Sequence, residues 1–389
     1  MGKARPARRA ASAARDALRR ADARVRQTTR PREVCTSVEE WAATHGGAEA
    51  QRLLPARHIT RKLPRTVETE VHPSYTSRLA SDQRARYLVP VHGARLVGTS
   101  GLVVLPDGRP AAESVYGAAQ LTQESDYTEP RRKRTVAKEG DYFSLVVNWS
   151  AAGNYYHWMH DTLTRLYGVG DFLPPQTKYV VPADLRPFQE DSLRALGIGE
   201  DRMARFDGTE VWELETLHFA PPVTNSGSDL RAADVWTRDQ IMAHYDIVPS
   251  RSGRRIFISR EHAPRRRLAN QAEVEPILDR FGFETVAAER LTFRQQVELF
   301  SGAEAVVAIH GAGFTNMLFS PPGLVVLDMI EPSRLTHAFV FWTMAEELGH
   351  DYWYVVTGTA PRPGRQSDAV ITPESLQATL EQLPLGPKR

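Results

Sequence analysis

Residues 305–329 read AVVAIHGAGFTNMLFSPPGLVVLDM and contain two apolar runs separated by a turn and a short helical stretch. The first run, Ala305–Ile309, has the length and the β-branched composition of a buried strand. A turn over His310–Gly313 follows it, and the breaker Pro321–Gly323 precedes the second run, Leu324–Met329. Continuously apolar strands are typical of parallel sheets covered on both faces. The stretch therefore predicts two parallel strands joined by a short helix.

Alternating strand and helix patterns precede this stretch. They are a strand over Arg255–Ser259, a helix that Asn270 and Glu273 cap and Gly282 ends, a strand over Phe283–Ala287, and a helix that Thr292 and Gln295 cap and that ends near Gly302. Such alternation predicts a parallel α/β sheet of the nucleotide-binding type.

The first half of the chain shows a similar but weaker alternation. Its expected elements are short strands between residues 87 and 105, a strand over Tyr142–Val147, a helix over Asn154–Tyr167, a strand over Lys178–Val181, a helix over Pro187–Leu196, a strand over Thr216–Ala220 and a helix over Asp229–Ala243. A polar stretch near residues 249–253 indicates a domain boundary. We expect an Arg-rich tail and lead-in segment over 1–83, one domain over 84–249, and a second over 250–389 that ends in a helix.

Composition excludes several classes of protein. The chain has 389 residues, 41% of them hydrophobic, and a net charge of +2, so bulk electrostatics predict no nucleic-acid partner. A single cysteine, Cys35, cannot form an intramolecular disulfide. We found neither an apolar run of about 18 residues nor a signal-peptide core. A cytoplasmic protein is therefore expected.

The first 33 residues are dense in Arg and Ala and have almost no large apolar side chains. Such a segment cannot bury a core. Two interpretations stay open: a solvated arm, or a basic segment that contacts an anionic membrane surface weakly and places the protein peripherally at the inner membrane face.

Two groups of residues after strands of the second half predict a phosphate site. His310, Gly311 and Gly313 follow a buried strand, where the glycines would let a ligand approach the backbone and the next helix would present its N–H groups. The alternative is a tight turn that needs glycine for a positive φ. Arg260 and Arg267 lie in the loop after another strand of this half, and arginine forks suit phosphate.

Other chemistry is not supported by motifs. The second half lacks the glycine patterns of dinucleotide-binding and P-loop proteins, and the chain lacks a nucleophile elbow for esterase chemistry. His157, His160 and Asp161 do not have metal-ligand spacing, so no metal site is expected. Asp328 and Glu331, near the end of the last buried strand, could accept a hydrogen bond from a sugar hydroxyl or could simply be solvated.

The helix expected over Asn154–Tyr167 carries a candidate catalytic pair. His157 and Asp161 are four residues apart, so they share one face and can act as a base and its orienting partner. The alternative is an ordinary structural His–Asp pair. The buried stripe of the same helix is predicted to consist of Tyr155, Trp158, Met159, Leu163 and Leu166.

Several blocks together resemble glycosyltransferase family 61. They are NYYHWMHD at 154–161, ISR at 258–260, RLANQAE at 267–273, and SGA at 301–303 through HGAGFTN at 310–316 to FSPPG at 319–323. The resemblance implies a GT-B architecture, with two Rossmann-like domains facing each other across a cleft. It also implies a nucleotide-sugar donor, commonly a UDP-sugar, bound by the second domain, and inverting, metal-independent transfer without a further cofactor. By position, the donor-side residues are Arg260, Arg267, Asn270, His310, Gly311, Gly313, Thr315, Asn316 and Asp328, and the acceptor-side residues are His157 and Asp161.

Our hypothesis is that Asp161, oriented by His157, removes the proton of an acceptor hydroxyl, while Arg260, His310 and the helix after Gly313 stabilise the leaving diphosphate. Which of the pair is the base stays open. For bacterial-type relatives the resemblance implies a saccharide or lipid-linked saccharide acceptor in surface polysaccharide biosynthesis. A non-catalytic sugar-nucleotide or glycan-binding protein of the same fold is the alternative.

Overall fold

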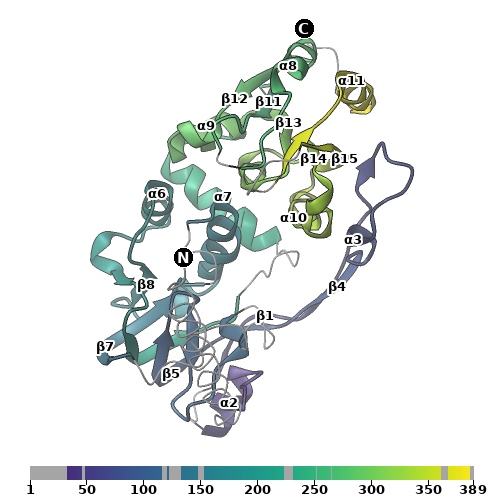
Figure 1. Ribbon diagram of the computed structural model, residues 1–389. Coiled ribbons are helices and arrows are strands. Elements are labelled where there is room, and N and C mark those ends of the chain that lie inside the picture. The colour runs from purple at the N-terminus through teal and green to yellow at the C-terminus, as the bar shows by residue number, and fades with distance from the viewer. Residues whose placement is uncertain are drawn as a thin grey trace, which may run out of the picture.

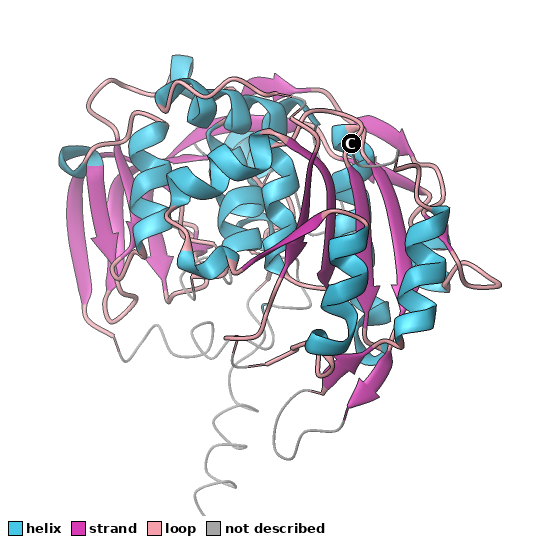
Figure 2. Cartoon of the chain, turned by 90° about the horizontal axis from the view of Figure 1, so that it is seen from above, coloured by secondary structure: helices cyan, strands magenta, loops and turns pink. Residues whose placement is uncertain are grey.

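Two large sheets dominate the computed structural model, and helices gather between them (Figures 1 and 2). The structure describes residues 33–45, 49–115, 121, 133–147, 153–222, 231–250, 252–263, 265–360 and 367–385. The basic tail expected over residues 1–33 therefore lies, except for Glu33, outside the described residues. No helix in these ranges is both long enough and apolar enough to cross a membrane.

The sheet built mainly from the second half of the chain, which we call the second sheet, is entirely parallel. Its strands are β11 (Arg254–Ile258), β12 (Phe283–Val286), β13 (Ala303–Ile309), β14 (Val325–Ile330), β15 (Asp351–Val356) and the short β3 (Arg65–Thr66) from the lead-in segment. Their order in the sheet is β12-β11-β13-β14-β15-β3. Every residue of β14 is buried, which agrees with the continuous apolar run in the sequence. The parallel sheet predicted for this half is confirmed.

Helices cover both faces of this sheet. Alternate strand residues join two different apolar clusters, because successive side chains point to opposite faces. One face packs against α8 (Gln271–Arg280) and α11 (Pro373–Gln382), and the other packs against α9 (Phe293–Ser301) and α10 (Phe339–Leu348). The short helices are η6 (Ala288–Arg290), η7 (Ala312–Phe319) and η8 (Pro332–His337), and β16 (Gly358–Ala360) pairs with β17 (Asp368–Val370).

The two capping boxes have different outcomes. Thr292 and Gln295 form theirs at the start of α9 as expected. The Asn270 side chain makes no capping hydrogen bond to α8. Its Nδ2 instead donates to the Ile371 carbonyl at 2.8 Å, and its Oδ1 accepts from the Ile371 N–H at 3.3 Å. The capping role predicted for Asn270 is wrong because its amide is used by a distant backbone segment.

The first sheet is mixed, which differs from the parallel sheet we expected. Its strands are β1 (Gln51–Leu54), β5 (Arg86–Val97), β6 (Leu102–Val104), β7 (Thr135–Ser144), β8 (Lys178–Pro182), β9 (Met203–Phe206) and β10 (Val211–Phe219). β10 pairs antiparallel with β5 and parallel with β7, and β7, β8 and β9 are parallel neighbours. Strand β7 begins earlier than predicted because residues from Thr135 onward pair with β10. A mixed α/β architecture is established, and the GT-B arrangement stays a prediction.

Further helices and a hairpin complete the described chain. They are α2 (Val38–His45), α3 (Pro73–Thr76), η1 (Ala112–Ser114), η2 (His157–Thr162), η3 (Leu163–Leu166), η4 (Gly170–Phe172), α6 (Pro187–Ala195), η5 (Glu200–Arg202), α7 (Arg231–His244), and the pair β2 (Arg57–Thr60) with β4 (Ala80–Gln83). The long helix expected from Asn154 is divided into the π-helix η2 and the 3-10 helix η3. Of its predicted stripe, Trp158, Met159, Leu163 and Leu166 are nevertheless buried, whereas Tyr155 is partly buried.

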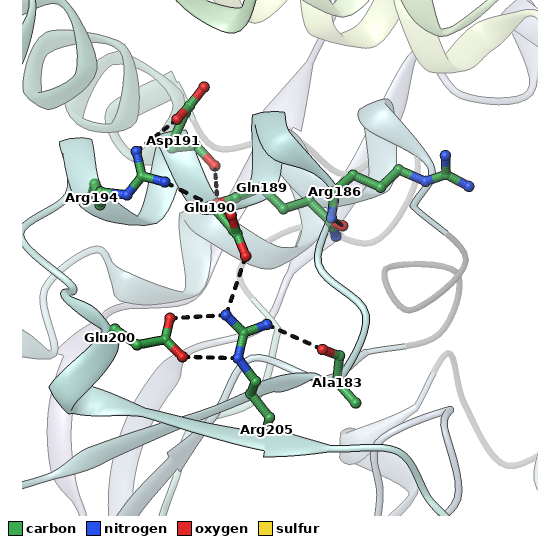
Figure 3. A network of polar contacts seen from close by, with 9 residues as sticks. Ala183, Arg186, Gln189, Glu190, Asp191, Arg194, Glu200 and Arg205 are labelled. Carbon is green, nitrogen blue, oxygen red and sulfur yellow. Dashed lines mark hydrogen bonds and ion pairs between the residues drawn. The ribbon is translucent and has the colours of Figure 1, made fainter.

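An ion-pair network ties α6 to the first sheet (Figure 3). Arg205 of β9 donates to Glu190 of α6 at 3.1 Å and to Glu200 at 2.8 Å. Arg194 adds a contact to Asp191 at 2.8 Å. The side chains of this network are partly exposed, so each pair contributes modestly and the network serves mainly to fix the helix on its strand.

One apolar core joins the two halves. It includes Trp158 and Met159 of η2 together with Phe314, Phe341 and Trp342 of the second half. Helix α7 contacts α6 on one side and α10 and η7 on the other. The lead-in segment contributes β1 to the first sheet and β3 to the second. The domain boundary near residues 249–253 stays a prediction.

A buried histidine predicts how stability depends on pH. His350 lies in this core and its Nε2 donates to the Met317 carbonyl at 3.0 Å. Burial lowers the pKa of its imidazole from 6.5 to about 4. The unfolded chain therefore binds a proton that the folded chain does not, and stability present above pH 6.5 is lost as the pH falls toward 4. We expect the free energy of unfolding to fall by about 3 kcal/mol less between pH 6.5 and 4 in His350→Gln than in the wild type. Urea unfolding at several pH values measures this difference.

The matched control is His58→Gln, which changes an exposed histidine. This control should retain the wild-type pH dependence. An unaltered pH dependence in His350→Gln would contradict the prediction.

Candidate functional site

The site lies at the carboxyl ends of β11 and β13. The chain leaves β11 toward β12 on one side and returns to β13 on the other side, so these two strands flank the point where the strand order reverses. In open α/β sheets, ligands bind outside the carboxyl ends of the strands at such a point. Arg260 follows β11 closely, and His310 follows β13 directly. The topology thus brings together two residues that the sequence had singled out separately.

The alternative explanation for the glycines after β13, a turn that needs a positive φ, is wrong, because neither Gly311 nor Gly313 has a φ in the left-handed region. Gly311 has a φ of 178°, which is extended backbone that any residue can adopt. A Cβ on Gly311 would lie 2.8 Å from Nη1 of Arg260, and a Cβ on Gly313 would lie 3.2 Å from Cγ2 of Ile258. The glycines therefore make room for β11 and the residue beyond it. Gly311 in particular lets the Arg260 guanidinium lie against the backbone.

The loop after β11 holds two inward-facing arginines. Arg260 Nε donates to the Arg266 carbonyl at 2.9 Å, and its Nη2 donates to the Arg265 carbonyl at 3.2 Å. Arg266 has a φ of 57°, and its Nη1 donates to the His310 carbonyl at 3.5 Å. Burial, together with the charges of Arg260, Arg334 and Arg265, lowers the pKa of Arg266 to about 10. Burial also lowers the pKa of Arg260.

Arg334 joins them from η8, which follows β14. We call Arg260, Arg266 and Arg334 the arginine cluster. In the described ranges none of the three forms an ion pair with a carboxylate, and the buried Nε atoms of Arg266 and Arg334 have no hydrogen-bond partner. Glu289 acts on Arg260 only from a distance and raises its pKa. Buried cations without a counter-charge are unfavourable, so the cluster is arranged to receive an anion.

Two predicted donor-side residues point elsewhere. Arg267 pairs with Asp368, its Nε lying 3.5 Å from Oδ2, and its backbone N–H donates to Oδ1 of the same carboxylate at 2.9 Å. Asn270 binds the backbone of Ile371, as described above. Both hold the C-terminal β17 segment against the loop. The structure does not bring them into the arginine cluster.

Thr315 and Asn316 are completely buried in η7. Asn316 accepts a hydrogen bond from the Tyr155 hydroxyl at 2.7 Å and donates to Gln296 at 2.9 Å. Tyr155 belongs to the first half of the chain, so Asn316 fastens the two halves together. Because neither side chain has any exposed surface, neither is placed to contact a ligand.

His310 is held by a buried carboxylate. Its Nδ1 lies 2.7 Å from Oδ2 of Asp328, and the Tyr352 hydroxyl donates to the same oxygen at 2.7 Å. Asp328 has no exposed surface, so neither of the two sequence interpretations, contact with a sugar hydroxyl or a solvated carboxylate, describes it. It orients His310 instead. The other acidic candidate, Glu331, accepts hydrogen bonds from Ser333 and Thr359 and caps η8.

The predicted acceptor-side pair forms on the π-helical turns of η2. His157 Nδ1 and Asp161 Oδ2 are 2.6 Å apart. The side chain of His157 is 19% exposed, whereas that of Asp161 is 2% exposed. His160, three residues on from His157, instead pairs with Asp234 of α7 at 3.0 Å in the interior. His157 is therefore the member of the pair that reaches the surface.

A chain of aromatic contacts links the two histidines. The ring of Tyr156 lies 5.3 Å from that of His157 and 5.5 Å from that of Phe341, between ring centroids. Phe341 in turn lies 4.9 Å from His310. Only the rings of Tyr156 and Phe341 thus lie between His157 and His310 in this series of contacts. The arrangement can bind a polyanion at the arginine cluster and place a His–Asp base nearby.

Arg266, Arg334 and Tyr352 were missed by sequence reasoning. Arg266 is one of three consecutive arginines, and nothing in the sequence shows which of them turns inward. Arg334 could have been found from its place just after the buried strand of Asp328. Among the described residues no group of three or more His, Cys, Asp or Glu side chains is arranged to hold a metal ion.

Part of the chain that carries this site matches a known protein family. Residues 155–327 match the family described as Glycosyltransferase 61. The matched segment begins at the η2 pair and ends in β14, so it includes His157, Asp161, Arg260, Arg266 and His310. The resemblance stated from the sequence is confirmed for this segment.

Two curated relatives match parts of the chain. One is protein O-linked-mannose beta-1,4-N-acetylglucosaminyltransferase 2 of Takifugu rubripes, 30% identical over 152 residues, which are 36% of this chain and 24% of the relative. The other is beta-1,2-xylosyltransferase XYXT1 of Oryza sativa subsp. japonica, 32% identical over 87 residues, which are 22% of this chain and 18% of the relative. The chain thus spans about a quarter or less of the length of these relatives.

The geometry of Gly311 gives a direct test of the anion site. In Gly311→Ala the new Cβ would displace the Arg260 guanidinium, its nearest neighbour at 2.8 Å, without straining the backbone. We expect pyrophosphate to bind about tenfold more weakly by calorimetry, with little change in Tm.

Gly313→Ala is the contrasting variant, because its Cβ meets the Ile258 side chain rather than an arginine. It should lower Tm and leave pyrophosphate affinity near the wild-type value. Unchanged binding in Gly311→Ala would contradict the assignment.

Proposed function

We propose that the protein is an inverting, metal-independent glycosyltransferase that uses a nucleoside-diphosphate sugar, with UDP as the nucleotide. The observation that carries the proposal is the arginine cluster, which gathers three cations without a carboxylate partner beside His310 in the described chain. The match to family 61 and the two relatives, both named as sugar transferases, support the same class of reaction. Those names differ in the sugar transferred, so the sugar is left open.

The donor diphosphate is assigned to the arginine cluster. Two phosphates bring about two to three negative charges, which guanidinium groups can bind through paired hydrogen bonds. The half-buried position of the cluster strengthens these contacts, because water competes less there. The cluster can supply the positive charge that a divalent cation brings in other transferases. This is the basis for proposing transfer without a metal.

The base is assigned to His157, with Asp161 as its orienting partner. This reverses the roles of our sequence hypothesis, and the reason is burial. Asp161 is enclosed and bonded to Nδ1 of His157, whereas the imidazole reaches the surface. An imidazole bonded to a carboxylate through Nδ1 can accept a proton at Nε2, and the carboxylate stabilises the imidazolium that forms.

The reaction is a single displacement. The acceptor hydroxyl gives its proton to His157 as its oxygen bonds to the anomeric carbon. The bond from that carbon to the diphosphate oxygen breaks, and the electron pair leaves with the diphosphate. Attack from the face opposite the leaving group inverts the anomeric centre. The arginine cluster and His310 stabilise the charge that develops on the diphosphate.

The acceptor is proposed to be a saccharide or lipid-linked saccharide in surface polysaccharide biosynthesis at the inner membrane face. Only the family resemblance supports this part of the proposal.

Nucleotide binding is tested by calorimetry with UDP, GDP, ADP and CDP, each with and without EDTA. We expect UDP to bind most tightly and independently of EDTA. Arg266→Gln should weaken its binding about 10- to 100-fold, because a charge-assisted contact is lost.

Arg267→Gln is the matched control, since its side chain pairs with Asp368. It should bind UDP like the wild type. If no nucleotide binds, the transferase proposal loses its main support, and a glycan-binding protein becomes the better description.

The base assignment is tested by turnover of the donor with a saccharide acceptor. His157→Gln is expected to lower kcat about 10²- to 10⁴-fold, because the group proposed to take the proton of the acceptor hydroxyl is lost. Asp161→Asn should cost less and should move the acidic limb of the pH profile, because the imidazole loses its carboxylate. A larger loss in Asp161→Asn than in His157→Gln would return the role of base to Asp161.

A further inference from the structure

We infer that Asp368 is a positioning residue for the arginine cluster. It holds the peptide group between Arg266 and Arg267 in the orientation that lets Arg260 and Arg266 reach the site. The hold on this peptide group stands on geometry alone, and its consequence for binding the donor rests on the proposed function.

The peptide group between Arg266 and Arg267 is bonded on both of its sides. Its carbonyl accepts a hydrogen bond from Nε of Arg260 at 2.9 Å, and its N–H donates to Oδ1 of Asp368 at 2.9 Å. The group therefore connects the Asp368 carboxylate to the Arg260 guanidinium. Hydrogen bonds in such a series polarise one another, so the contact at Asp368 also strengthens the contact at Arg260.

The backbone at Arg266 needs support from its surroundings. Its φ of 57° lies in the left-handed region, which residues with a Cβ rarely adopt. In this conformation Nη1 of Arg266 reaches the His310 carbonyl at 3.5 Å. Such conformations persist only where neighbouring contacts fix them. If the next peptide group turned over, its N–H would face the Arg260 guanidinium in place of its carbonyl, and the bonds to Arg260 and Asp368 would break together.

Asp368 can give this support because it begins a buried segment. Directly after it, the Ala369 N–H donates to the Arg267 carbonyl at 2.8 Å, and the Ala369 carbonyl accepts from the Ala269 N–H at 2.8 Å. Ala369 and Ile371 lie in the apolar cluster that covers one face of the second sheet. The loop after β11 is thus attached to a fixed strand, and Asp368 is the side chain of that strand that meets the peptide group beside Arg266.

Charge alone predicts the opposite effect of losing Asp368. Its Oδ2 lies 3.5 Å from Nε of Arg267. Without Asp368 the Arg267 guanidinium would lose this carboxylate, and a further cation near the cluster would strengthen the binding of an anion. A positioning role predicts weaker binding. The direction of the change therefore distinguishes the two explanations.

The test compares Asp368→Ala with Asp368→Asn in the full chain, with pyrophosphate binding measured by calorimetry. Both substitutions remove the charge opposite Arg267, but Asn keeps an oxygen that can accept from the Arg267 N–H. We expect Asp368→Ala to bind pyrophosphate about tenfold more weakly than the wild type. Asp368→Asn should bind it as tightly as the wild type or more tightly. Undiminished binding in Asp368→Ala, or equal weakening in both variants, would overturn the inference.

The control for a general loosening of the loop is Asn270→Ala. This substitution removes two hydrogen bonds to the backbone of Ile371 from the same loop, three residues beyond Arg267. It should lower Tm, as Asp368→Ala does, and leave pyrophosphate affinity within about twofold of the wild-type value. Weakening equal to that of Asp368→Ala would show that loosening explains both variants, and the inference would fail.

Hydrogen exchange separates this inference from the proposed function, because it needs no ligand. The Arg267 amide hydrogen should exchange about tenfold faster in Asp368→Ala than in the wild type or in Asp368→Asn. If it does and the wild type binds neither pyrophosphate nor a nucleotide, the hold of Asp368 on the peptide group stands and the proposed function fails. If the wild type binds pyrophosphate and the exchange rate is unchanged in Asp368→Ala, the inference fails and the proposed function stands.

Discussion

The site depends on holding three positively charged guanidinium groups close together at one edge of the second sheet. Arg260 and Arg334 both repel Arg266, and Arg260 and Arg266 have each lost part of their hydration. Backbone carbonyls of the loop fix Arg260 and Arg266, and the reversal of strand order between β11 and β13 determines where they meet. The surrounding α/β sheet stabilises an arrangement that the cluster alone would disfavour. A polyanion bound at this edge would relieve the repulsion, which is why we propose an anionic group of the substrate as its ligand.

The acceptor side is joined to this edge by packing rather than by a flexible linker. Trp158 and Met159 of η2 lie in the same core as Phe314 and Phe341, and Tyr155 reaches across to Asn316. The π-helical turns of η2 keep His157 and Asp161 in contact while burying the carboxylate. Because the core is shared, the separation of His157 from the arginine cluster is set by side-chain packing.

The sequence predicted the parts of this molecule that are governed by local patterns. Continuous apolar runs identified β13 and β14, and four-residue spacing identified the pair of His157 and Asp161. Long-range pairing was less accessible, so the antiparallel contact of β10 with β5 was missed. Among consecutive arginines, composition could not distinguish Arg266, whose φ of 57° turns it inward, from Arg267, which an aspartate near the C-terminus holds. Asp328 was expected at the surface although the apolar run around it favoured burial.

The lead-in segment has a mechanical consequence. After β1 in the first sheet, the chain crosses to add β3 to the edge of the second sheet and returns through β4 to begin β5 (Figure 1). On the way, Thr66 and His72 bind the backbone and hydroxyl of Tyr354, and Arg78 stacks 3.6 Å above Phe339. The segment between β1 and β5 therefore connects the two halves and is anchored to both. A rotation of one half against the other would have to stretch this segment or break its contacts with Tyr354 and Phe339, so the segment restrains such a rotation.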